Sequence, residues 1–404
     1  MRVCMVTTCF PRFAGDHAGV FIFSLARALA ARGLEVDVVA PHAPGAPRRQ
    51  TVAGVRVHRF TYAWPTRLEK LAYEDGIPDN IARSKWVLLQ VPTFLSAAAA
   101  AVARVGRRAE LIHAFWTPCG ALAAPTARLW RVPLLVTLLG DGIRGSALVN
   151  RIALSASAGV VCSTEEMAGY LRRYRFDGEV FDIKHMPDTA RLDPSAELDA
   201  DLAEWCRPAD GAVVTFIGRL VPFKDPLGFV RAVPAVLARH GKARFLLVGD
   251  GPLKVPAERL AEELGVAGSV RFTGSRHDVG AILRASAVFV ANSPVCNCYS
   301  TTILEAMTVG VPAVVSDAGD PTGSFKAKDY VESVRPADPA DLARGINALL
   351  ADPARRARRA EMGRQFLVDL GFHPDIVVGR TLEAYRRLIG AGWRATTKPQ
   401  GNAP

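Results

Sequence analysis

Two cations stand five residues apart in the segment Gly218–Asp225, where Arg219 and Lys224 follow the apolar run Val213–Gly218. A guanidinium, which is always charged, and a lysine ammonium together suit a ligand with two phosphates. The run before them is typical of a buried strand, and ligands of α/β proteins bind beyond the carboxyl ends of such strands. These features predict phosphate binding, with an ordinary solvated loop as the alternative.

A second polar segment leads from Asn292 into a predicted helix that carries Glu305. Its candidate binding residues are Asn297, Cys298, Tyr299, Ser300 and Thr301. The first turn of a helix has N–H groups without partners in the helix, and these groups can bind a phosphate. A carboxylate on the next turn can accept hydrogen bonds from two sugar hydroxyls. The pattern predicts a site for a phosphate and a sugar.

The first half of the chain carries a glycine-bearing loop after the predicted strand Arg2–Thr8. Gly15, Asp16 and Gly19 lie in this loop, just before a predicted helix. Its N–H groups and the helix N-terminus can face an anionic or hydroxylated ligand. A plain connecting loop would look similar.

Two further polar residues follow apolar runs in the first half. His113 lies near the end of the predicted strand Glu110–Phe115 and is expected to face the ligand cleft, with a packed structural histidine as the alternative. Asp141 lies between two glycines, where it is a candidate catalytic residue that offers a polar group to a ligand, or simply forms a turn.

Short apolar runs alternate with amphipathic segments along the chain, which is typical of parallel α/β architecture. The predicted strands are Arg2–Thr8, Glu35–Pro41, Val55–Phe60, Glu110–Phe115, Leu134–Leu139 and Gly159–Ser163, then Val213–Gly218, Arg244–Gly249, Val270–Thr273, Ala287–Ala291 and Pro312–Ser316. The pattern loosens into acidic sequence around Pro194–Pro208. We therefore predict two doubly wound, Rossmann-like domains, 1–195 and 208–373, that face each other across a cleft.

The composition fits a folded chain of two or three domains, with 404 residues, 50% hydrophobic and 22% charged. The net charge of +11 favours an anionic partner. Nucleic acid is not expected, because the basic residues are dispersed and no aromatic-basic motif is found. Seven cysteines without metal-ligand spacing indicate reduced thiols in a cytosolic chain and no metal site. The run Arg355–Arg359 is expected to be a solvated helix face.

The longest apolar stretch is Trp86–Val105. Polar residues and Pro92 interrupt it, and alanine dominates its second half, so a helix packed on a sheet is expected rather than a membrane span. An interfacial helix that ends in Arg104, Arg107 and Arg108 is the alternative, and it would place the chain in peripheral contact with a membrane.

Taken together, these segments resemble family 4 of the retaining glycosyltransferases, enzymes of the GT-B fold that use nucleotide-activated sugars. The resemblance covers nearly the whole chain. It rests on the F-P-R-F-x-G-D loop at Phe10–Asp16, on G-R-L-x-x-x-K-D at Gly218–Asp225, and on the segments Val248–Pro252, Val270–Gly274 and Leu304–Pro312.

The resemblance implies a role for each part of the chain. Arg219 and Lys224 would bind the donor diphosphate and stabilise charge on the leaving phosphate, without a metal or other cofactor. Glu305 would hold the nucleotide ribose, and the segments with Arg276 and Gly251 would border the base. The first domain would hold the acceptor, and the C-terminal helix 374–390 would pack back on that domain.

Two departures from the family pattern bear on the substrate. Asn297 occupies a position where the family usually has a glutamate that contacts the donor sugar, and Leu139 stands where a histidine is common. An amide binds hydroxyls without a charge, so it would tolerate an acidic sugar. The alternatives are a GT-B sugar phosphorylase, a nucleotide-sugar epimerase, or a non-catalytic nucleotide-sugar-binding protein. The acceptor stays open among glycans, glycolipids and small molecules, in bacterial polysaccharide or natural-product biosynthesis.

Overall fold

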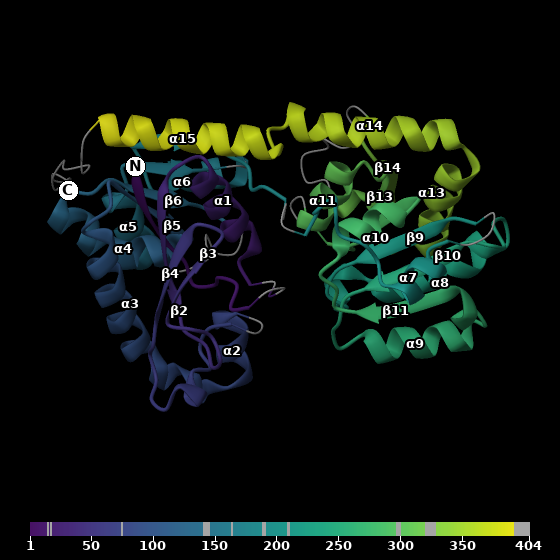
Figure 1. The fold of residues 1–404 in the computed structure, drawn as a ribbon, viewed down its shortest axis with the longest axis horizontal. Coiled ribbons are helices and arrows are strands. Elements are labelled where there is room, and N and C mark those ends of the chain that lie inside the picture. Colours follow the sequence, from purple (N-terminus) through teal and green to yellow (C-terminus); the bar gives the residue numbers. More distant parts are fainter. Residues whose placement is uncertain are drawn as a thin grey trace, which may run out of the picture. The chain divides into compact units, whose positions relative to one another are not determined.

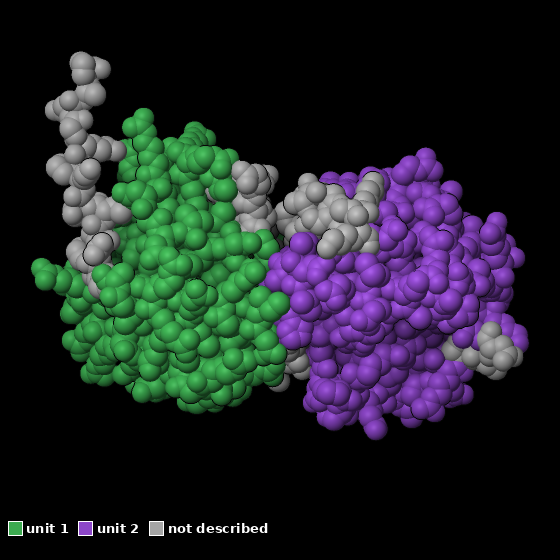
Figure 2. All heavy atoms as spheres, turned by 90° about the horizontal axis from the view of Figure 1, so that it is seen from above, with its two compact units in different colours: residues 1–185, 375–404 green, residues 186–374 purple. Residues whose placement is uncertain are grey.

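The computed structural model of the protein describes residues 1–391 except 14–15, 17, 74–75, 140–145, 163–164, 188–190, 208–210, 296–299 and 320–328. The chain divides between His185 and Met186 into two units (Figure 2). Unit 1 comprises the described parts of residues 1–185 and 375–404, and unit 2 comprises those of residues 186–374. Each unit is a parallel α/β sheet with helices, so the predicted fold class is confirmed.

Unit 1 contains an eight-stranded sheet with the order β3-β4-β2-β1-β5-β6-β7-β8 (Figure 1). Its strands are β1 (Arg2–Val6), β2 (Glu35–Pro41), β3 (Arg49–Val52), β4 (Val55–Phe60), β5 (Leu111–Phe115), β6 (Leu134–Thr137), β7 (Gly159–Val161) and β8 (Glu179–Phe181). Neighbouring strands are parallel except β3 and β4. The strand order reverses between β1 and β5, and ligands of doubly wound sheets bind at such a point.

Unit 2 contains a six-stranded sheet with the order β11-β10-β9-β12-β13-β14. Its strands are β9 (Val213–Ile217), β10 (Arg244–Val248), β11 (Val270–Gly274), β12 (Val288–Ala291), β13 (Ala313–Ser316) and β14 (Glu332–Val334), all parallel. The order reverses between β9 and β12. The loops that follow these two strands carry the predicted phosphate and sugar sites, so the topology brings them together.

Helices connect the strands because parallel neighbours require a crossover. In unit 1 they are α1 (Val20–Ala31), α2 (Ile77–Arg83), α3 (Val91–Gly106), α4 (Thr117–Trp130), α5 (Ala147–Ala156), α6 (Glu165–Arg173) and α15 (Pro374–Gly390). In unit 2 they are α7 (Ala200–Trp205), α8 (Pro226–Leu237), α9 (Lys254–Glu263), α10 (Val279–Ala285), α11 (Thr301–Val309), α13 (Pro339–Ala351) and α14 (Pro353–Asp369). Helices on both faces bury the central strands, which explains their continuous apolar sequences.

The last helix, α15, packs on unit 1 although it follows unit 2 in the chain. Tyr385 in α15 is fully buried, and its hydroxyl lies 2.7 Å from Nδ1 of His113 in β5. At the same helix, Arg380 Nη1 donates to the carbonyl oxygen of Asp182 over 3.0 Å. The chain thus returns to its first half.

The acidic segment expected to separate the domains folds as part of unit 2. Asp199 Oδ1 accepts a hydrogen bond from the backbone N–H of Leu202 over 2.8 Å and so caps α7. Leu202 is 1% exposed and belongs to the core of that unit. The division of the chain lies before this segment, between His185 and Met186.

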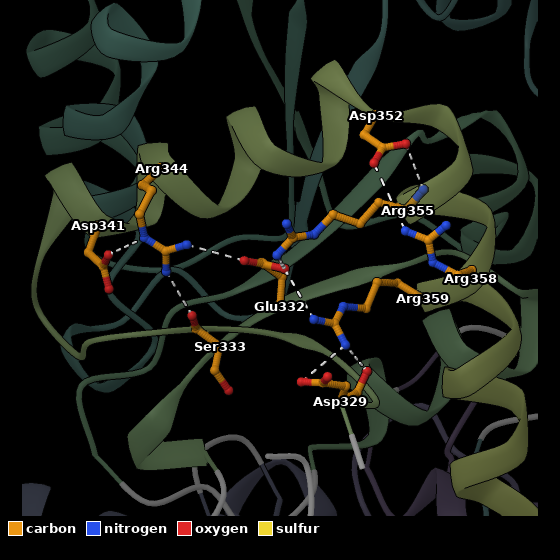
Figure 3. Close-up of polar contacts among 9 residues, drawn as sticks. All are labelled: Asp329, Glu332, Ser333, Asp341, Arg344, Asp352, Arg355, Arg358 and Arg359. Atoms are coloured by element: carbon orange, nitrogen blue, oxygen red, sulfur yellow. Dashed lines mark hydrogen bonds and ion pairs between the residues drawn. The ribbon is translucent and has the colours of Figure 1, made fainter. Parts of the chain in front are cut away.

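A buried carboxylate joins the last elements of unit 2 (Figure 3). Glu332 in β14 is 4% exposed, and it accepts hydrogen bonds from Arg355 over 2.7 Å and from Arg344 over 3.2 Å. Arg359 Nη2 lies 3.6 Å from the same carboxylate. The sequence analysis predicted that the arginine run at the start of α14 is a solvated helix face. This prediction is wrong in part, because Arg355 and Arg359 turn inward to Glu332.

Candidate functional site

The loop after β9 places both predicted cations at the carboxyl edge of the unit 2 sheet. The guanidinium of Arg219 lies 5.6 Å from the centre of the Phe223 ring, and Nζ of Lys224 lies 5.7 Å from the same ring. Lys224 Nζ also donates to Ser300 Oγ over 3.3 Å. Burial of the ammonium and the nearby charge of Arg219 lower the pKa of Lys224 to about 8. An anionic ligand such as a phosphate would favour the charged ammonium and raise this pKa again.

Hydrogen bonds from the loop after β12 hold the lysine loop in place. Asn292 Nδ2 donates to the backbone oxygen of Asp225 over 2.8 Å, and Ser293 Oγ donates to the backbone oxygen of Phe223 over 2.5 Å. Asp225 Oδ1 in turn accepts from the N–H of Gly228 over 2.9 Å and caps α8. Two side chains on a neighbouring strand end thus position Lys224, which makes Asn292 and Ser293 positioning residues that we did not predict.

Gly251, a predicted donor-binding residue, lies against the Arg219 loop. Its φ is +153°, and a Cβ added there would lie 2.6 Å from the backbone oxygen of Leu220. The backbone N–H of Leu220 donates to the oxygen of Asp250 over 2.9 Å. Only glycine allows this close approach, so Gly251 helps to shape the loop that carries Arg219.

Helix α11 brings the predicted sugar and phosphate residues to the same edge. Ser300 precedes its first residue, Thr301, so the N–H groups of this first turn lie beside Lys224. Glu305, on the next turn, is 1% exposed, and its Oε1 lies 4.0 Å from Nη1 of Arg191. The arrangement places a buried carboxylate behind a cationic, N–H-rich edge.

Arg276 and Arg191 meet at one side of this edge. The guanidinium of Arg276, a predicted donor-binding residue, is held by Asp278 over 2.5 Å and by Asp199 over 2.8 Å. Arg191 Nη2 donates to the backbone oxygen of Arg276 over 3.4 Å. Because the side chain of Arg276 already forms ion pairs with two carboxylates, we expect any contact of this residue with a ligand to be made by its backbone. Arg191 joins this turn to Glu305 and was not predicted.

Several candidates lie outside the described residues. These are Gly15, Asp141, Asn297, Cys298 and Tyr299. Their predicted roles stay predictions.

In unit 1, the loop after β1 holds Asp16 in a tight cluster. Asp16 accepts from the backbone N–H of Arg12 over 2.9 Å and from Arg12 Nε over 2.6 Å. Burial alone would raise the pKa of Asp16, but the hydrogen bonds from Arg12 outweigh it and lower the pKa. Gly19 begins α1 with a φ of +67°, and a Cβ there would lie 2.4 Å from the oxygen of Cys9. Both residues thus fix the loop itself.

Arg59 lies beside this loop and was missed by the sequence analysis. It is 5% exposed, and its Nη2 donates to the backbone oxygen of Pro11 over 2.5 Å. Its Nε and Nη1 are buried without a hydrogen-bond partner, and burial lowers its pKa. The alternation of apolar and polar residues from Val55 to His58 could have indicated that Arg59 faces inward, on the same side as Val55 and Val57.

The structure corrects the expectation for His113. The side chain is 2% exposed within β5, and its Nε2 lies 2.6 Å from Thr137 Oγ1 while its Nδ1 contacts Tyr385. Burial lowers the pKa of His113 to about 3, so the ring is neutral. It packs as a structural histidine and does not face a ligand, because α15 covers it.

A pocket of about 620 Å³ in unit 2 lies away from the paired cations. Its lining includes Ala212 and Val213 at the start of β9 and Lys242 and Ala243 just before β10. These residues mark the amino edge of the sheet, whereas doubly wound sheets bind ligands at the carboxyl edge. We therefore assign the site to the Arg219 and Lys224 loop.

Comparisons with known proteins give the same architecture. Two family models match the chain, glycosyl transferases group 1 over residues 199–366 and the glycosyl transferase 4-like domain over residues 18–183. The fold resembles that of Anabaena HepE, solved in complex with UDP and glucose, with a TM-score of 0.65 and 18% identity over 96% of this chain and 100% of that one. Two doubly wound units of this kind define a protein of the GT-B class.

Curated relatives match all or part of the chain. The lipopolysaccharide core biosynthesis glycosyltransferase LpsD of Rhizobium meliloti is 32% identical over 52% of this chain, and the match spans 58% of that relative, less than two thirds of its length. The D-inositol 3-phosphate glycosyltransferase of Nocardiopsis dassonvillei is 26% identical over 92% of this chain and 90% of its own length. With both halves matched by family models, the chain belongs to the group 1 glycosyltransferases of the GT-B fold.

Proposed function

We propose that the protein transfers a sugar from a nucleoside-diphosphate sugar to an acceptor, with retention of the anomeric configuration. The observation that carries the proposal is the contact of Lys224 with Ser300 over 3.3 Å, which places a partly buried ammonium beside the N-terminus of α11. Arg219, on the same loop, adds a second positive charge. Paired cations and helix N–H groups at one strand edge suit a diphosphate. The UDP bound to HepE supports a nucleotide donor.

The chemistry assigned to these residues is electrostatic. As the bond between the anomeric carbon and the phosphate oxygen breaks, negative charge grows on the diphosphate, and the two cations stabilise it. The acceptor hydroxyl attacks on the same face and gives its proton to the leaving diphosphate. Among the described residues, no group of three His, Cys, Asp or Glu side chains could hold a metal ion. We propose that the two cations perform the task that a metal performs elsewhere.

Unit 1 is proposed to hold the acceptor through the loop after β1. Arg12 in this loop lies 4.8 Å from the centre of the Tyr73 ring, and the orphaned nitrogens of Arg59 lie beside the same loop. These groups favour an acceptor with hydroxyl or anionic groups. The five described free cysteines support a reducing, cytoplasmic setting for the reaction.

Donor binding and turnover can be tested together. A thermal-shift screen of nucleoside diphosphates and their sugars should show stabilisation of about 2.7 kcal/mol at about 100 times the dissociation constant. The best donor is then incubated with acceptor panels, with and without a chelator, and the product linkage is determined by NMR. Transfer with retention that persists in chelator supports the proposal. Donor binding without transfer to any acceptor, or phosphate-dependent reversal without a nucleotide, contradicts it.

Glu305→Gln should weaken binding of the free nucleoside diphosphate about tenfold, because a charge-assisted hydrogen bond to the ribose becomes a neutral one. Calorimetry measures the affinity, and thermal unfolding of the unliganded variant measures stability. A loss of stability with unchanged affinity would instead make Glu305 a structural partner of Arg191, 4.0 Å away.

The pKa of Lys224 makes donor binding depend on pH. Because its pKa is about 8 in the free protein, the side chain loses its proton as the pH rises through 8. A bound diphosphate favours the protonated form, so affinity should fall by up to about tenfold for each pH unit above 8 and binding should take up a proton. Calorimetry in buffers of different ionisation enthalpy measures that uptake. Lys224→Arg keeps its charge and should give a flat profile between pH 7.5 and 9.5; a parallel decline in both proteins would contradict the assignment.

A further inference from the structure

Exposed apolar side chains gather between β4 and α3 of unit 1. They are Trp64, Leu68, Trp86, Leu88, Leu89 and Leu95, and we call them the apolar patch. Trp64 and Trp86 are each 80% exposed, and Leu89 is 71% exposed. Gln90 Nε2 donates to the backbone oxygen of Leu68 over 2.6 Å, which joins the two segments that carry the patch. The stretch Lys85–Gln90, which carries three residues of the patch, contacts both α2 and α3.

Such a group of side chains indicates an interaction surface. Single exposed leucines are common, but neighbouring large apolar groups on one surface mark a place where the protein meets a partner. Tryptophan is the residue that sits best at the boundary between lipid headgroups and acyl chains.

The adjoining helical stretch is apolar as well. Lys85–Gly106 is long and apolar enough to cross a membrane, judged by length and composition alone, yet only 22% of its most apolar part is buried. Phe94, Ala98 and Val102 on its inner face are at most 4% exposed and belong to the core of unit 1. A spanning helix would have to leave that core. The stretch can therefore only contact a membrane with its outer face, lying along the surface.

Three exposed cations lie in the segments that carry the apolar patch. Arg67, Lys70 and Lys85 are exposed, and none of them forms an ion pair with another described residue. Glu69, the acidic residue between the first two, turns inward, where its Oε2 lies 2.5 Å from Nδ1 of His42. Within residues 67–70, the exposed side chains are thus apolar or cationic.

A basic pocket of about 360 Å³ extends this charge along α3. Its lining includes Arg48, Arg49 and His58 from the β3–β4 side and Arg104 from the helix, next to the small side chains of Ala97 and Ala100. The buried Arg59 also lines it, and a pocket with four arginines suits a phosphate-bearing headgroup.

We propose that the apolar patch and its cationic surroundings bind the surface of an anionic membrane. Tryptophan and leucine would enter the interface, while Arg67, Lys70 and Lys85 contact lipid phosphates. A second copy of the chain fits less well, because patch-to-patch contact would bring these cations face to face. The segment follows the carboxyl end of β4, at the edge assigned to the acceptor. Resting on the proposed function, this placement makes a lipid-linked acceptor the favoured class.

Vesicle flotation of the full chain tests the proposal without any donor or acceptor. The protein should float with vesicles that contain phosphatidylglycerol and much less with pure phosphatidylcholine, and high salt should weaken binding. The double variant Trp86→Ser/Leu89→Ser should bind at least about tenfold more weakly. Lys70→Ser and Lys85→Ser, which leave the apolar groups in place, should each weaken binding about fivefold. The matched control is Leu129→Ser/Trp130→Ser on α4, where the side chains are 72% and 41% exposed.

The outcomes distinguish a failure of the membrane-binding proposal from a failure of the proposed function. Binding that only the patch and lysine variants lose, with unchanged thermal unfolding, supports the proposal. Absence of binding to anionic vesicles, or equal loss in the α4 control, overturns it. So does a dimer in light scattering that becomes a monomer in Trp86→Ser/Leu89→Ser, since a second copy would then cover the patch. Donor hydrolysis without vesicles should stay unchanged in every variant; if it is absent throughout while flotation persists, only the proposed function fails.

Discussion

Replacing Arg219 or Lys224 by alanine should lower turnover by at least about 100-fold, the usual cost of losing one preorganised charge at a leaving group. Hydrogen bonds from Asn292 and Ser293 hold the backbone on both sides of Lys224, so the loop should keep its conformation when the side chain is removed. Steady-state kinetics with the donor found by thermal shift measure the effect. The loss should fall mainly on kcat, because the charge that the cations stabilise grows in the transition state.

The matched control for this pair is Arg259→Ala in α9. Arg259 is exposed in the same unit, and it forms no ion pair with the other described residues. Its removal changes the net charge by the same amount and should change turnover by no more than about twofold. Near-normal rates in both Arg219→Ala and Lys224→Ala would remove the diphosphate assignment. An equal fall in the control would show that net charge, rather than position, controls the rate.

The sequence predicted the fold class and most strands of both sheets because central parallel strands are continuous apolar runs. The edge strands β3, β8 and β14 were not predicted. β8 (Glu179–Phe181) and β14 (Glu332–Val334) are only three residues long, and β3 contains arginine and glutamine, so none shows such a run. Boundaries of the units were less clear, since the acidic sequence near Asp199 caps a helix instead of forming a linker.

The two cations of the site, Arg219 and Lys224, could be predicted from the sequence because they directly follow a strand. Their partners were not, because Arg191 and Asn292 meet the site only through tertiary contacts. Sequence spacing does not tell which strands are neighbours, and the pairing of β9 with β12 brings Ser300 to Lys224. His113 shows the reverse case, since it looked accessible at a strand end until α15, distant in the chain, covered it.

The Glu332 network gives the second large expected effect, on stability rather than on turnover. Three guanidinium groups surround a carboxylate whose side chain is 5% exposed, and they come from α13 and α14 (Figure 3). Removing one partner of a buried ion pair typically costs about 3 to 5 kcal/mol, because the remaining charges keep their desolvation penalty. Arg344 and Arg355 are 52% and 38% exposed, so water can partly solvate them after the change.

Glu332→Gln should therefore destabilise unit 2 by about 3 kcal/mol, the low end of that range. Hydrogen exchange followed by mass spectrometry resolves the peptides of β13, β14 and α14, so it reports the opening of this unit apart from unit 1. Glu361→Gln is the matched control, because Glu361 is 67% exposed and pairs with Arg364 on the same helix. The control should change exchange little, within about 0.5 kcal/mol. Equal exchange in Glu332→Gln and the native protein would contradict this prediction. It would mean that apolar packing holds β14 to α13 and α14 and that the ion pairs of Glu332 add no stability.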